Sequence, residues 1–111
     1  MNGSEISYSL DDVCVLIAES ETRGEHGEAI VTRSEWEVYC RRRNINQSEF
    51  FKAHQEGLRS DICLLLNFED YSGEKIVEYD GKEYAVYRVY ERGDGFAELY
   101  MSERAGVSDG L

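Results

Sequence analysis

The sequence contains no proline, only three cysteines and no long apolar run. Without proline, every residue can donate a backbone hydrogen bond, so nothing in the chain blocks strand pairing. No apolar stretch approaches the roughly 18 residues that would span a bilayer, and the first dozen residues lack the basic and apolar regions of a signal peptide. We therefore expect a protein that is made in the cytosol and binds no membrane.

The cysteines are Cys14, Cys40 and Cys63, which are odd in number and too widely spaced for a paired-thiolate zinc motif. Each lies in an apolar, strand-like segment. This pattern predicts reduced thiols packed in a core and gives no reason to expect a metal or cofactor.

Positive charge is also scarce, with 12 basic residues against 23 acidic ones and a formal net charge of −11. Binding to nucleic acid through its phosphates needs a basic face, so this charge argues against it. Three possibilities remain, namely plain solubility, a basic protein partner, or a surface that must repel DNA. A length of 111 residues predicts a single domain, and the composition is that of a globular one.

What the sequence does contain is strand patterning. Residues 13–18 are an apolar run that predicts a buried strand. Within 31–43, Trp36, Val38 and Cys40 alternate with more polar residues, which predicts a strand with one buried face. Residues 62–68 and 96–101 alternate in the same way.

Turn residues separate these segments. Asp80-Gly81 lies between two alternating runs, and this pair tolerates the positive φ angles of a type I′ hairpin turn. A second turn is predicted at Arg92–Gly95. Residues 19–29, rich in glutamate around Gly24 and Gly27, predict a mobile acidic loop.

Residues 46–61, NQSEFFKAHQEGLRSD, interrupt the strand pattern. Apolar or small residues recur there at helical spacing along one face, at Phe50, Ala53, His54, Gly57 and Leu58. About three turns of helix are too short to be stable alone, so this helix should pack on the rest of the protein.

Together these elements predict a mainly β fold, a small antiparallel β-barrel of about six strands with one short helix between the second and third long strands. Closure removes unpaired strand edges and encloses one core. We expect one barrel domain at 13–104, a flexible N-terminal segment at 1–12 and a flexible tail at 105–111.

An ordered series of short motifs resembles the head-tail adaptor family of tailed phages and prophages, whose members are head-completion or head-closure proteins. The resemblance spans residues 13–106 and is carried by the series rather than by any one element. Its elements are Ser48–Ala53, Gly57-Leu58, Ile62, Asp70-Tyr71, Gly73-Glu74, Tyr79–Tyr84, Val86–Arg88 and Glu98–Tyr100. The cysteines, Trp36 and the first dozen residues have no counterpart in the pattern.

The resemblance implies a structural subunit of the virion neck, made in the cytoplasm of a bacterial host. Copies would form a ring between a portal-side adaptor protein and a tail-completion or tail-terminator protein, and DNA would pass through the channel without specific binding. Because like-charged copies repel, we expect the isolated protein to be a monomer at low concentration.

Several candidate surfaces follow from this resemblance. The segment 44–59 would project toward the channel or pack against the adaptor, with one of two adjacent phenylalanine rings sealing the barrel and the other meeting a neighbour, unless both lie in the core. Asp70 and Tyr71 would dock the tail side. The channel-facing acidic loop would comprise Glu19, Glu21, Glu25 and Glu28, and the adaptor or subunit interface would comprise Arg41, Arg42, Arg43, Phe50, Phe51 and Leu58. Both charged groups could instead be plain solvated surface.

Enzyme chemistry has little support. His26 lacks a second ligand at metal-binding spacing, and His54 lies on the apolar side of the predicted helix. The alternative to the ring subunit is an acidic binding module, for example a DNA mimic that inhibits a basic protein. A mimic needs negative charges arrayed on a rigid surface, whereas here many lie in a glycine-containing loop or alternate with basic residues.

Overall fold

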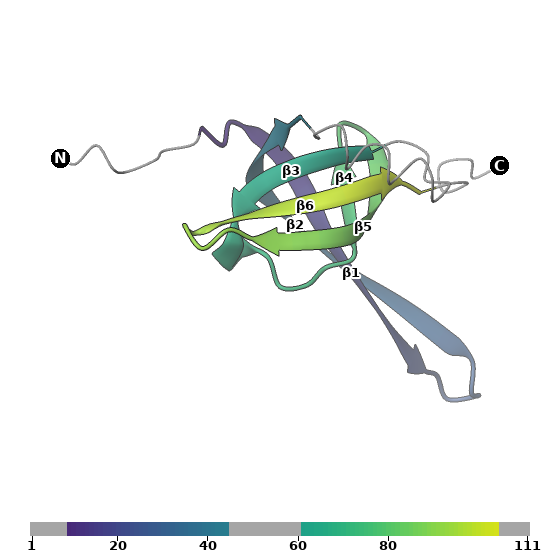
Figure 1. Ribbon diagram of the computed structural model, residues 1–111. Coiled ribbons are helices and arrows are strands. Elements are labelled where there is room, and N and C mark those ends of the chain that lie inside the picture. The colour runs from purple at the N-terminus through teal and green to yellow at the C-terminus, as the bar shows by residue number, and fades with distance from the viewer. Residues whose placement is uncertain (1–8, 45–60, 105–111) are drawn as a thin grey trace.

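A computed structural model describes residues 9–44 and 61–104 (Figure 1). The six strands are β1 (Asp12–Arg23), β2 (Ala29–Arg43), β3 (Asp61–Asn67), β4 (Ile76–Tyr79), β5 (Lys82–Glu91) and β6 (Phe96–Glu103). They close into a barrel in the order β1-β2-β3-β6-β5-β4, and every pairing is antiparallel. The prediction of a small antiparallel barrel is confirmed.

Helical structure in the described residues is limited to η1 (Phe68–Asp70), one turn of 3-10 helix. Phe68, predicted at the end of a strand, begins this turn instead. The helix predicted over 46–61 lies outside the described residues except for Asp61, which begins β3. Neither described range holds a helix long and apolar enough to span a membrane.

The core consists of side chains that alternate inward from all six strands. Leu16, Leu64, Leu66, Leu99 and Met101 are completely buried within it. Burial of one such side chain stabilises a fold by about 1.5–3 kcal/mol, so this cluster is the main source of stability. All three cysteines are buried free thiols; Cys14 and Cys40 lie in the core as predicted, whereas Cys63 is buried on the other face of β3.

The predicted hairpins are present. Asp80 and Gly81 have φ angles of 55° and 81°, as a type I′ turn requires, and they join β4 to β5. The second predicted turn joins β5 to β6, with Gly93 and Gly95 at φ 90° and 94°.

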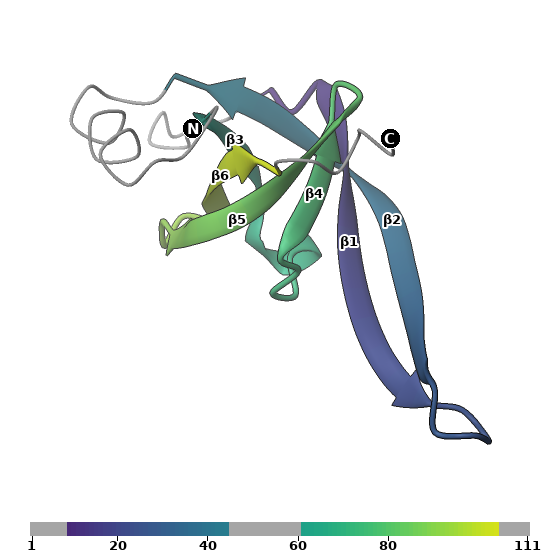
Figure 2. The same cartoon turned by 90° about the vertical axis from the view of Figure 1, so that its right-hand side faces the viewer.

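One pair of strands extends beyond the barrel. β1 and β2 pair from Asp12 and Cys40 to Arg23 and Ala29. In β1 only 15–17 also pair with β4, and in β2 only 40–43 also pair with β3. The rest of the hairpin has no third strand on either edge, and it projects from the barrel end opposite the β4–β5 turn (Figure 2). We call residues 18–37 the arm.

The arm corrects two predictions. The acidic loop predicted at 19–29 was wrong for 19–23 and 29, which belong to β1 and β2, so the connection is only 24–28. The single buried face predicted for residues 31–43 was also wrong over 31–37, where every residue is exposed. The reason is that a strand beyond the barrel has no facing sheet to cover it.

Candidate functional site

The arm has two unlike faces. Directly paired residues of antiparallel strands lie on the same face, so the register assigns every side chain to one of them. The uncharged face continues the inward-facing row of Cys14 and Leu16, and it comprises Ala18, Ser20, Thr22, Ile30, Thr32, Ser34 and Trp36. The other face, which we call the charged face, comprises Glu19, Glu21, Arg23, Ala29, Val31, Arg33, Glu35 and Glu37. Apart from Ala18, all of these residues are exposed.

The tip of the arm is a hydrogen-bonded turn. The Gly24 N–H donates to the Glu28 carbonyl oxygen at 2.8 Å, and the Gly27 N–H donates to the Gly24 carbonyl oxygen at 3.1 Å. Arg23 Nη1 donates to the Gly27 carbonyl oxygen at 2.8 Å, and the His26 N–H donates to Glu28 Oε1 at 3.0 Å. A Cβ atom at position 24 would lie 2.1 Å from Glu28 Oε2, so only glycine fits there without displacing that carboxylate.

The structure separates the four predicted channel residues into two groups. Glu19 and Glu21 lie on the charged face along β1, whereas Glu25 and Glu28 lie at the tip. All four are exposed. Their orientation toward a channel stays a prediction.

One ion-pair network links the arm to the barrel wall. Arg33 Nε lies 3.5 Å from Glu19 Oε2, and its Nη2 lies 2.8 Å from Glu83 Oε2 on β5. Arg104 Nη1 lies 3.1 Å from the other oxygen of Glu83. The hydrogen bond to Glu83 raises the pKa of Arg33. These groups are partly exposed, so the network contributes at most about 1 kcal/mol.

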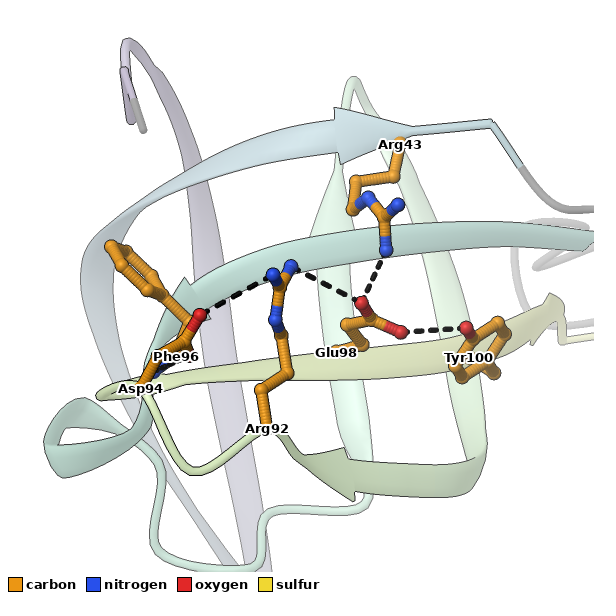
Figure 3. A network of polar contacts seen from close by, with 6 residues as sticks. All are labelled: Arg43, Arg92, Asp94, Phe96, Glu98 and Tyr100. Atoms are coloured by element: carbon orange, nitrogen blue, oxygen red, sulfur yellow. Dashed lines mark hydrogen bonds and ion pairs between the residues drawn. The ribbon is translucent and has the colours of Figure 1, made fainter. Parts of the chain in front are cut away.

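A second polar network lies on the outer face of β2, β3, β6 and β5 (Figure 3). At its centre is Glu98, whose side chain is only 8% exposed. Its Oε2 atom accepts from Arg43 Nη1 and lies 3.4 Å from Arg92 Nη1, while its Oε1 atom accepts from the Tyr100 hydroxyl at 2.7 Å. Arg92 Nη2 also lies 3.3 Å from Asp94 Oδ2. Burial and then the bond to Glu98 raise the pKa of Tyr100.

The strand register extends this network into two rows across four strands. One row runs Arg41, Leu65, Glu98, Tyr90, and the next runs Arg43, Cys63, Tyr100, Arg88. The guanidinium carbon of Arg88 lies 4.9 Å from the centre of the Tyr100 ring, as in a cation–π contact. We call Arg41, Arg43, Arg88 and Arg92 the arginine patch.

Of the three consecutive arginines predicted as an interface, the structure brings only Arg41 and Arg43 to this face. Arg42 points to the opposite side of β2. The hydrogen bond to Asp12 raises the pKa of Tyr79 and burial raises that of Tyr84, and the charge of Arg42 offsets part of each increase. A cavity of about 300 Å³ adjoins this strand end, and its described lining residues are Arg41, Arg42, Arg43, Asn44 and Leu65. Phe50, Phe51 and Leu58 lie outside the described residues.

Sequence reasoning missed Arg88 and Arg92 as members of a site. Arg88 lies in β5 after a β-bulge between Val86 and Arg88, which reverses the alternation that starts at the Asp80-Gly81 turn, and Arg92 follows the end of β5. Their proximity to Arg41 and Arg43 also depends on β3 and β6 lying between β2 and β5. No local signal gives that order.

The predicted tail-side residues differ in their surroundings. Tyr71 packs against the core, and its hydroxyl donates to the Glu74 carbonyl oxygen at 2.6 Å. Burial and the nearby Glu74 carboxylate raise its pKa. Tyr71 therefore holds the loop after η1 in place. Asp70 ends η1 and is partly exposed. Tail-side docking stays a prediction.

At the barrel end far from the arm, Tyr79 and Cys40 are buried and form side-chain hydrogen bonds. The Tyr79 hydroxyl donates to Asp12 Oδ2 at 2.5 Å, and this bond, followed by burial, raises the pKa of Tyr79. A hydrogen bond with the Cys14 thiol, and then burial, raise the pKa of the Cys40 thiol. A thiol that stays protonated is a poor nucleophile and a poor metal ligand.

Among residues 9–44 and 61–104, no group of three or more histidine, cysteine or acidic side chains is placed to hold a metal ion. No protein-family model matches the sequence, and no curated protein matches it. The resemblance to head-tail adaptor proteins therefore stays a prediction. Within the described residues, the arm and the arginine patch are two features that packing of the barrel core does not explain.

Proposed function

We propose that the protein is a non-enzymatic structural subunit of a phage or prophage head-tail connector. Copies form a ring that joins a portal-side adaptor to a tail-completion or tail-terminator protein and lines or closes the DNA channel. The observation that carries this proposal is the arm, a hairpin exposed on both faces. Nearly all of its residues are exposed, so contacts outside the chain best explain its length.

The charge of the arm supports the same function. Glu25 and Glu28 stand at the tip, farthest from the barrel, and Glu19 and Glu21 follow along one edge strand. Carboxylates that face a DNA channel repel phosphates, so the wall does not grip the passing duplex. A net charge of −11 suits such a wall.

The rival function, inhibition of a basic protein by DNA mimicry, receives less support. A mimic needs an uninterrupted array of negative charges on a rigid surface. On the charged face, Arg23 and Arg33 lie among the glutamates, and Arg33 forms an ion pair with Glu19. The arginine patch adds positive charge to another face of the same small domain.

The proposal predicts that portal and adaptor genes lie beside the gene for this protein, and it is tested by mixing the protein with that portal–adaptor complex and imaging the product by negative-stain electron microscopy. We expect an added ring on the adaptor end of the portal. A variant in which residues 19–33 are replaced by Asn-Gly should fold but not add this ring, because the barrel core stays intact. A Lys82→Ala variant is the control, since Lys82 is exposed at the far end of the barrel.

Two results would contradict the proposal. One is failure of the full-length protein to bind the portal–adaptor complex. The other is tight inhibition of a nuclease or polymerase by the protein, which would favour the mimic.

A further inference from the structure

The backbone of the arm leaves hydrogen-bonding groups unpaired along its edges. In an antiparallel ladder, pairs that exchange hydrogen bonds alternate with pairs whose backbone groups point away from each other. The Gly24 N–H donates to the Glu28 carbonyl oxygen at the tip, so in the same register the even-numbered residues of the arm exchange hydrogen bonds across the hairpin. The backbone N–H and C=O groups of the odd-numbered residues therefore point outward.

The pairing of β1 with β4 agrees with this alternation. The Val86 N–H donates to the Lys75 carbonyl oxygen, so in the β4–β5 register Ile76 and Glu78 turn their backbone groups toward β1. Their partners in β1 are odd-numbered residues. The odd-numbered residues of the hairpin thus bond a third strand where there is one, and in the arm they have none.

The two edges of the arm differ in length. On β1 the unpaired edge covers only 18–23, because β4 pairs with 15–17. On β2 it covers 31–37, ahead of the pairing with β3 that starts at Cys40. Every residue of 31–37 is exposed, and no hydrogen bond within the described residues reaches its outward backbone groups. Such an edge is a template for another strand.

The β2 edge is complementary to itself about Ser34. In an antiparallel pair of two such edges centred there, Arg33 lies opposite the partner's Glu35, and Val31 lies opposite the partner's Glu37. Centring the pair on Arg33 or on Glu35 instead would set like charges directly opposite. A shift by one residue would put the charged face of one arm beside the uncharged face of the other.

We infer that the β2 edges of two copies pair antiparallel over 31–37, with Ser34 opposite the partner's Ser34, so that two arms form one four-stranded sheet. The arm points away from its own barrel, which leaves the edge accessible (Figure 2). The contact is isologous, because the same stretch serves both copies and overlaps with itself completely. The occupant of the edge is therefore a second copy of this chain.

Backbone hydrogen bonds and the uncharged face carry this contact. In the inferred register all the outward groups of 31–37 find a partner, and Thr32 lies beside the partner's Trp36, whose ring is 38% exposed in a single copy. Charge attraction adds little, because Arg33 already binds Glu19 and Glu83. Repulsion between copies of charge −11 keeps the dimer weak, so the monomer prevails at low concentration.

Proline substitution tests the edge without breaking the hairpin. Glu35→Pro removes a backbone N–H that points outward, and an edge strand tolerates proline at such a position. Glu21→Pro is the matched control, because it removes the same side chain and an outward N–H from the β1 edge; both residues are exposed. Thermal melts check that each variant is folded.

The measurement is sedimentation equilibrium at up to about 1 mM protein in about 0.15 M NaCl, where the Debye length is about 8 Å. We expect a monomer–dimer equilibrium for the wild-type protein. Glu35→Pro should associate at least about tenfold more weakly, whereas Glu21→Pro should associate like the wild type.

A cysteine at the centre of the contact tests the register. Ser34→Cys places two thiols opposite each other in a pair with Cα atoms about 4.5 Å apart, within the range of a disulfide. Thr32→Cys is the control, because its two thiols would be offset by roughly 13 Å along the strands. The native cysteines are buried and should not react. Oxidation with glutathione disulfide followed by a non-reducing gel should show a cross-linked dimer for Ser34→Cys only.

Three results overturn the inference. The first is a wild-type protein that stays monomeric over the whole concentration range. The second is association of Glu35→Pro that is no weaker than that of Glu21→Pro, and the third is equal cross-linking of Ser34→Cys and Thr32→Cys. If proline unfolds either variant, the two cysteine variants decide.

This dimer goes beyond the proposed connector function and does not rest on it. All of these measurements use the isolated protein, so their failure leaves the connector function standing. Failure of the adaptor-binding experiment likewise leaves the dimer standing.

Discussion

Leu16 and Trp36 are direct partners in the ladder between β1 and β2, yet Leu16 is completely buried and Trp36 is 38% exposed. Both lie on the face of the hairpin that points into the barrel at Cys14. The change from buried to exposed therefore occurs within one pair of residues. It marks the place where the β1–β2 hairpin leaves the core and becomes the arm.

This boundary predicts that truncating the Leu16 and Trp36 side chains lowers stability by unequal amounts. Leu16→Ala leaves a cavity in the core and should lower the free energy of unfolding by about 3 kcal/mol. Trp36→Ala removes a side chain that is partly exposed beyond the core, and it should cost less, about 2 kcal/mol or below. Urea denaturation followed by circular dichroism measures both. An equal or larger loss for Trp36→Ala would place that ring within the core.

Glu98 predicts a large cost for removing one buried charge. Glu98→Ala leaves Arg43 and Arg92 without the carboxylate they share, and it should lower the free energy of unfolding by about 3 kcal/mol. Glu91→Ala is the matched control, because Glu91 is exposed on the neighbouring strand and its loss should change stability by at most about 0.5 kcal/mol. Similar denaturation midpoints for the two variants would mean that the network adds nothing.

The β4–β5 turn requires a left-handed backbone conformation at Gly81. Gly81→Ala should lower the free energy of unfolding by about 1 kcal/mol, because φ at this position is 81°. Gly81→Asn should cost less, since asparagine tolerates this conformation better than alanine does. Thermal denaturation of the two variants compares them. The reverse order would show that the loss comes from side-chain contacts instead, although a Cβ at this position meets no atom within 4 Å.

The raised pKa of Tyr79 predicts that the fold loses stability at alkaline pH. Its pKa is raised in the folded state by the bond to Asp12 and by burial, whereas an unfolded tyrosine titrates near pH 10. Above about pH 10 the unfolded chain loses this proton and the folded chain keeps it, so stability falls by up to about 1.4 kcal/mol per pH unit for each such tyrosine. Below that pH the contribution is fully present.

The measurement is the urea midpoint of the wild-type protein and of Tyr79→Phe between about pH 8 and pH 11, a range that brackets the unfolded tyrosine pKa. Tyr79→Phe should show a shallower fall in alkali, because phenylalanine has no proton to lose. Parallel curves for the two proteins would mean that Tyr79 titrates normally in the fold.

Local chemistry was enough to predict much of the barrel. Asp80-Gly81 determines a turn with positive φ at both residues, and alternation around it determines which residues of β4 and of β5 up to Val86 face inward. The apolar segments that contain Cys14, Cys40 and Cys63 likewise predicted that the thiols are buried. These features depend on residues close together in sequence, and short-range geometry decides them.

The sequence alone thus determined a closed antiparallel barrel, its hairpin turns and its acidic charge. Only the tertiary structure decided that Trp36 emerges from the core, because the alternation of β2 is the same where a third strand is present and where it is absent. It also decided that Arg41 and Arg88 share a face, because that depends on β3 and β6 lying between their strands. Pairing between strands distant in sequence is a property of the whole barrel, and no local pattern encodes it.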